Sequence, residues 1–126
     1  MALNISLTCR PQEMKRKLRL PMYDVTLWIV VADDLEKAFK PFVKYFGDIS
    51  NRYSAACGYD YSSAQFGLFF GRKGLTLNTV CHEVFHLTHR LMDWAGVYFD
   101  AAHSEHGAML HGYLMELVCK TLAKRR

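Results

Sequence analysis

Two long segments in the second half of the chain carry apolar residues at helical spacing. They run from about residue 78 to 95 and from about residue 102 to 123, with the turn-like sequence GVYFDA between them. Proline is absent from both segments. We therefore predict two consecutive helices joined by a turn.

The first half of the chain contains one strand-like segment and one shorter helical segment. Residues 22–32 are rich in β-branched and aromatic side chains, which is typical of a largely buried strand. Residues 33–47 have apolar positions at helical spacing, with Asp33 or Asp34 as a possible cap and Gly47 as a stop. We expect Pro41 to kink or divide this helix.

The remaining segments complete an α+β plan. Residues 48–63 have a loop-like composition, whereas residues 64–78 resemble two short strands that turn through Gly71 to Gly74, where we expect a sheet edge. Residues 1–21 are polar and basic and end at Pro21. We predict an extended basic N-terminal arm over 1–21 and a single domain over 22–126, a small twisted sheet packed with helices.

Composition and charge narrow the possible functions. The chain has 126 residues, which is enough for one core, and a net charge of +4 concentrated at its two ends. Its four cysteines form no CxxC pair, so we expect reduced thiols in a cytoplasmic protein. Its longest apolar run, VTLWIVVA, is too short to cross a bilayer. A nucleic-acid partner would rest on the basic ends alone, and no phosphate loop or zinc knuckle supports one.

The most informative sequence is HEVFH, residues 82–86, in the first of the two helices. Its pattern, HExxH, places His82 and His86 on one helical face, where both rings could bind the same metal ion. Zinc bound by two histidines and a third protein ligand can lower the pKa of water from about 16 to about 7. Glu83 would then act as the general base.

The second helix offers a third ligand in HSEHGAMLHGYLMEL, residues 103–117. At about 100° per residue, one stripe of this helix carries acids together with small residues. Small residues allow close helix packing, so we expect this stripe to face the first helix while Glu105 reaches the metal. The stripe consists of Glu105, Ala108, Met109, Gly112 and Glu116.

HExxH followed by a helix with a Glu-x-x-Ala pattern resembles the compact gluzincin-type zinc metallopeptidases, and most closely small HExxH proteins of phage genomes. The second helix of those proteins reads approximately E--AYL-GYL, and this chain has EHGAMLHGYL. The resemblance covers about residues 75–118. It implies a zincin-like core in which His82, His86 and Glu105 bind Zn²⁺ and Glu83 is the catalytic base.

Four further residues could support such a site. His103 and His106 flank Glu105 and could replace it or polarise a substrate carbonyl. Asp93 and Glu116 could each orient a ligand imidazole by accepting its other N–H group, and the sequence does not choose between them. His89 lies about 10 Å along the helix from His82, too far to share one tetrahedral ion with both histidines.

These observations favour a zinc-dependent metallopeptidase that hydrolyses peptide bonds with metal-activated water. Its partner would be a peptide or protein, which an edge strand near residues 67–70 could align by backbone pairing. The alternative is a metal-binding phage protein that acts by binding a host protein without turnover.

Overall fold

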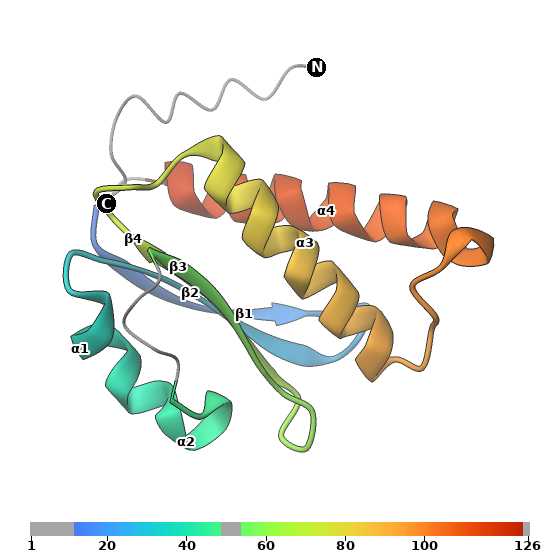
Figure 1. Ribbon diagram of the computed structural model, residues 1–126, viewed down its shortest axis with the longest axis horizontal. Coiled ribbons are helices and arrows are strands. Elements are labelled where there is room, and N and C mark those ends of the chain that lie inside the picture. The colour runs from blue at the N-terminus through green and yellow to red at the C-terminus, as the bar shows by residue number, and fades with distance from the viewer. Residues whose placement is uncertain (1–11, 49–53, 125–126) are drawn as a thin grey trace.

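One mixed four-stranded sheet organises the protein, as the computed structural model in Figure 1 shows for residues 12–48 and 54–124. Its order is β1-β2-β4-β3, with β2 parallel to β4 and the two outer pairs antiparallel. The strands are β1 (Met14–Leu20), β2 (Val25–Ala32), β3 (Ala55–Asp60) and β4 (Gln65–Gly71). The α+β class predicted from the sequence is confirmed.

The predicted position of the sheet edge was wrong. Residues 65–71 form the single central strand β4, whose Phe66, Leu68 and Phe70 are fully buried, and the chain then enters a helix without a hairpin. The edge is β3, in a segment that was predicted to be a loop. An edge strand pairs with only one neighbour and can therefore contain polar and small residues. For this reason the sequence of β3 does not have the apolar pattern that predicts a strand.

The predicted arm also differs from the structure. Residues 14–20 form β1 and pair with β2 along their whole length, so the domain begins before residue 22. Lys15, Lys17 and Arg19 occupy alternating exposed positions, which is why the strand looks like a basic arm in the sequence. Residues 1–11, the remainder of the predicted arm, lie outside the described part of the chain.

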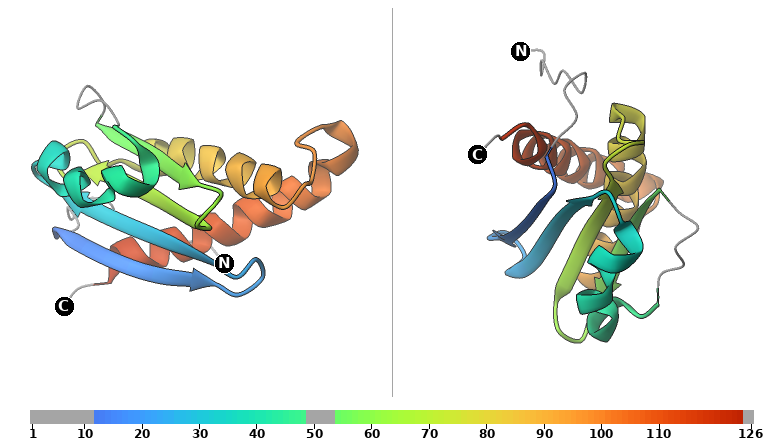
Figure 2. Two further views of the ribbon diagram at one scale, coloured as in Figure 1. Left: turned by 90° about the horizontal axis from the view of Figure 1, so that it is seen from below. Right: turned by 90° about the vertical axis from the view of Figure 1, so that its left-hand side faces the viewer.

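Helices cover both faces of the sheet (Figure 2). On one face lie α3 (Leu77–Trp94) and α4 (Ser104–Ala123), preceded by the short 3₁₀ helix η2 (Ala101–His103). Their apolar sides join Leu27, Ile29 and Phe66 in the main core. On the other face lie α1 (Leu35–Phe39), η1 (Lys40–Phe42) and α2 (Val43–Phe46). Their Phe39 and Phe42 pack on Phe69.

Local sequence accounts for the helix ends. Asp34 caps α1 by accepting from the backbone N–H of Lys37, and Thr76 caps α3 by accepting from that of Thr79. Pro41 divides the first helical segment, as predicted, and Gly47 ends it with a positive φ of 75°. The two long helices also match their predicted ranges to within about two residues.

The packing face of α4 differs from the prediction. Gly107, Leu110, Leu114 and Val118 are buried against α3 and the sheet. The stripe that was expected to face α3 is exposed along its whole length: Glu105, Ala108, Met109, Gly112 and Glu116. The branched apolar residues therefore set the buried face, since they remove more apolar area from water than alanine or glycine can.

The helices α3 and α4 run antiparallel. His111 lies beside Phe85, with ring centroids 6.3 Å apart, and Gly107 lies beside Met92 further along α3. None of the helices within residues 12–48 and 54–124 is both long and apolar enough to cross a membrane.

Candidate metal site

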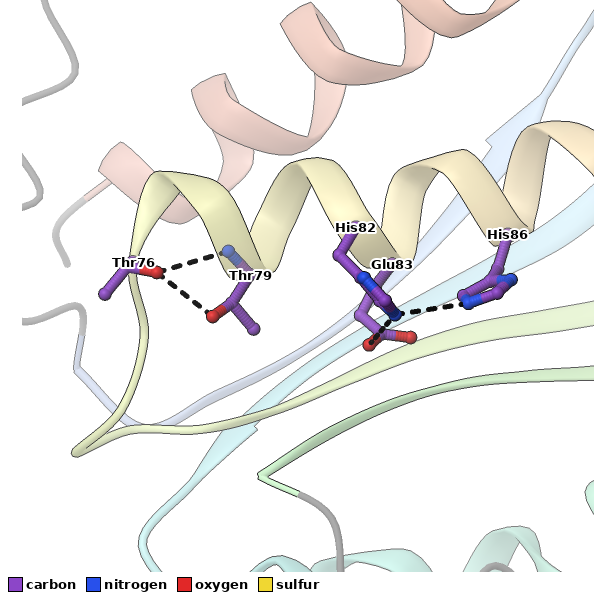
Figure 3. Close-up of polar contacts among 5 residues, drawn as sticks. All are labelled: Thr76, Thr79, His82, Glu83 and His86. Carbon is purple, nitrogen blue, oxygen red and sulfur yellow. Dashed lines mark hydrogen bonds and ion pairs between the residues drawn. The ribbon is translucent and has the colours of Figure 1, made fainter.

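The two histidines of HExxH project from the same side of α3 (Figure 3). Their Nε2 atoms lie 3.3 Å apart, and their ring planes are inclined at 74°. The spacing of four residues produces this arrangement because such residues are neighbours on a helix surface. The His82 side chain is well exposed, so an ion could reach the pair from solvent.

The separation of the two nitrogens fits joint metal binding. Two imidazole nitrogens held at about 2.05 Å from one tetrahedral zinc ion would lie about 3.3 Å apart. The same distance suits a hydrogen bond in which one neutral imidazole donates to the other. His82 and His86 are therefore placed to bind one ion without rearrangement of α3.

Glu83 lies next to the pair, with Oε2 3.9 Å from Nε2 of His82. Its side chain is buried, and burial raises the pKa of the Glu83 carboxyl above its ordinary value. Positive charge on His82 and His86 acts in the opposite direction, lowering this pKa. The carboxyl group is thus within reach of a molecule bound at the histidines.

A hollow of about 330 Å³ opens between α3 and the edge strand β3. Ala55, Ala56, Cys57 and Tyr59 of β3 form one side of it. The α3 side is formed by His82, Glu83, His86 and Arg90. We call this hollow the α3–β3 cleft. It places the HExxH residues beside a strand whose outer edge has no partner strand within the described chain.

Glu105 lies away from the histidine pair, contrary to the packing expected from the sequence. Gly107 packs beside Met92, which is six residues after His86 and therefore about 9 Å further along α3. Because α4 runs antiparallel, Glu105 lies beyond that level, on the exposed side of α4. Within the described ranges, no three His, Cys, Asp or Glu side chains are grouped to hold a metal ion.

The structure gives other contacts to the four supporting candidates. Asp100 contacts Nδ1 of His103 through Oδ1 at 2.6 Å, and the Tyr23 hydroxyl lies 3.0 Å from Nε2 of His106. Asp93 accepts a hydrogen bond of 2.8 Å from Tyr61, and Glu116 accepts one of 2.9 Å from Lys120. None of these contacts involves His82 or His86.

The two remaining histidines, His89 of α3 and His111 of α4, contact aromatic side chains. His89 packs on Phe99 with ring centroids 4.8 Å apart, and His111 contacts Phe85. A second hollow of about 440 Å³ lies between the two helices, lined mainly by apolar side chains, among them Phe85, Met92 and Phe99. It belongs to a different side of α3 from the α3–β3 cleft.

Five cleft residues were not predicted from the sequence, and the three with polar or reactive side chains are Arg90, Tyr59 and Cys57. Arg90 could have been predicted from its spacing. It lies eight residues after His82 and four residues after His86, and so shares their side of the helix. Tyr59 and Cys57 could not have been predicted in this way, because β3 was not predicted. Burial raises the pKa of the Cys57 thiol to about 12, and negative charge on Glu83 adds to this effect.

Comparisons with known proteins identify no relative. No family model matches the sequence, no curated protein matches it, and no solved structure matches the fold.

Proposed function

We propose that this protein is a zinc-dependent metallopeptidase in which His82 and His86 bind the ion and Glu83 is the general base. The observation that carries the proposal is the 3.3 Å separation of the two Nε2 atoms beside a buried carboxyl group. A zincin-like core, with the HExxH helix lying along an edge strand, is part of the same proposal.

In the proposed reaction a bound zinc ion supplies Lewis acidity toward the substrate carbonyl and the attacking water. Glu83 takes the proton of that water and passes it to the leaving nitrogen. A raised pKa suits this role, because a carboxyl group that binds a proton more readily is a better base.

The substrate proposed for this site is an extended peptide. The outer edge of β3, which has no partner strand among the described residues, can pair with a peptide backbone, and this would place one peptide bond beside His82 and His86. The sequence predicted that residues 67–70 would align the peptide, but those residues lie in the central strand β4. We therefore propose β3 as the strand that aligns the peptide.

The position of Glu105 favours a second candidate function. A catalytic zinc site ordinarily has three protein ligands. Two histidines without a third protein ligand therefore suit a metal site that binds a partner protein and catalyses no reaction. In that case the protein would bind a host protein through the α3–β3 cleft, with the ion as part of the contact.

Glu83→Gln separates the two candidates. The peptidase proposal predicts that the variant keeps bound zinc and loses hydrolysis of a peptide library, as followed by mass spectrometry. His82→Ala serves as the metal-free comparison. A wild-type protein that binds zinc and cleaves none of the library would reject the peptidase in favour of the binding protein.

A further inference from the structure

Arg90 lies in the α3–β3 cleft one helical turn after His86. Its guanidinium carbon is 4.0 Å from the centre of the Tyr59 ring on β3. The Arg90 charge also acts on the Tyr61 hydroxyl and lowers its pKa, against the larger effect of burial. Tyr59 thus contacts a half-buried cation at one end of the cleft, while His82 lies toward the other end.

Within residues 12–48 and 54–124 no carboxylate forms a direct ion pair with Arg90, although Asp93 accepts a hydrogen bond from Tyr61, on which Arg90 also acts. Three other cations in this part of the chain form such ion pairs: Arg19 with Asp24, Arg72 with Asp33 and Lys120 with Glu116. Stacking on Tyr59 occupies one face of the guanidinium plane, and its N–H groups point outward from the edges of that plane. This planar fork matches the two oxygens of a carboxylate.

We propose that Arg90 binds a carboxylate of the peptide that occupies the cleft and makes the site selective for acidic peptides. This inference rests on the proposed function for its peptide substrate, and it holds equally when the peptide is bound without turnover. Arg90 lies about 6 Å along α3 from His86, roughly the length of two extended residues. The carboxylate therefore belongs to Asp or Glu within about two residues of the bond beside the histidines, or to a free C-terminus.

The test uses zinc-loaded Glu83→Gln protein, so that bound peptides are not consumed. Immobilised protein is incubated with synthetic decapeptide mixtures that differ at one position, which holds Glu, Gln, Lys or Leu, each with a free or an amidated C-terminus. We expect retention of Glu peptides to exceed that of Gln peptides by about tenfold. A preference for free over amidated C-termini would instead assign the carboxylate to the chain end.

Adding Arg90→Gln should remove this preference and leave the zinc content unchanged. Adding Arg19→Gln is the control, because it removes the same charge from an exposed arginine of β1 and should leave the preference intact. Tyr59→Phe should keep the preference, whereas Tyr59→Ala should weaken it by releasing the guanidinium group.

The outcomes distinguish this inference from the proposed function. Hydrolysis by the wild type without any acidic preference would reject the role of Arg90 and leave the peptidase proposal intact. Acidic selectivity that depends on Arg90, with no hydrolysis by the wild type, would reject the peptidase proposal and support the role of Arg90. Failure of every mixture to bind, or an equal preference in the Arg90→Gln protein, would overturn the inference.

Discussion

Gly107 of α4 lies against Met92 of α3, where a Cβ atom on the glycine would be 3.5 Å from the methionine sulfur. This contact fixes the register of the two antiparallel helices. It places the start of α4 beside the end of α3, and HExxH lies nearer the start of α3. Glu105 is consequently separated from His82 and His86 along the helix axis.

The first prediction concerns Glu105. Because its carboxylate lies away from the histidine pair, Glu105→Ala should change zinc affinity by no more than about threefold, the scale of a screened long-range charge effect. Isothermal titration of the metal-free protein with zinc measures this affinity. A loss of binding as complete as that caused by His82→Ala would show that α4 begins beside the metal site, as the sequence resemblance implies.

The second prediction compares two glycines of opposite environment. A Cβ atom at Gly58 would lie 2.7 Å from Cγ of Phe46, whereas one at Gly112 would meet nothing within 4 Å. Gly58→Ala should lower the free energy of unfolding by about 1–3 kcal/mol through overpacking. Gly112→Ala should raise it by about 0.5–1 kcal/mol through helix propensity. Urea denaturation followed by circular dichroism measures both, and equal effects would contradict the packing of α2 on β3.

The third prediction concerns pH. Burial and the hydrogen bond to Asp93 raise the pKa of Tyr61 to about 12 from an ordinary value of 10.0. A phenol whose folded pKa is raised stabilises the fold fully below pH 10, and this contribution is lost as the pH rises toward 12. Asp93→Asn should lower the pKa of Tyr61, because it removes the charge that disfavours the phenolate.

Titration of the tyrosine ring signals by NMR measures the Tyr61 pKa, with Tyr61→Phe identifying the resonance. An ordinary pKa in the wild type, or no change in Asp93→Asn, would contradict the contact between Tyr61 and Asp93.

The fourth prediction concerns the thiols. Thiolate is the reactive form, and Cys57 has a pKa of about 12, so at pH 8 it should react slowly with a disulfide reagent. Cys81 is exposed and should react rapidly. Site-resolved mass spectrometry in a Cys9→Ser background follows each residue separately. Equal labelling rates for Cys57 and Cys81 would contradict the raised pKa and partial burial of Cys57 in the wall of the cleft.

Long periodic segments were predictable because helix periodicity depends on neighbours in sequence. The boundaries of α3 and α4 and the division of the first helix at Pro41 were found in this way. The strand β3 was missed because pairing on one edge tolerates Gly58 and polar neighbours, and its partner β4 supplies the apolar residues. β1 was missed because its exposed side is basic.

Only those residues of the candidate site that lie close together in the sequence could be predicted. His82, Glu83 and His86 follow from spacing on one helix, and Arg90 extends the same side. The placement of Glu105 depends on which side of α4 is buried and on the length of α3 after His86. The prediction of the buried side was wrong because the small residues Ala108 and Gly112 indicate close packing in the sequence, whereas Leu110 and Leu114 are the residues that pack.

The most direct test of the account is the zinc content of purified protein by elemental analysis, after zinc loading and gel filtration. We predict one zinc ion per chain for the wild type and near-complete loss in both His82→Ala and His86→Ala. His103→Ala, which alters a histidine held by Asp100 at the start of α4, should keep the ion. A wild type that retains no zinc, or a His82→Ala protein that retains as much as the wild type, would contradict the account.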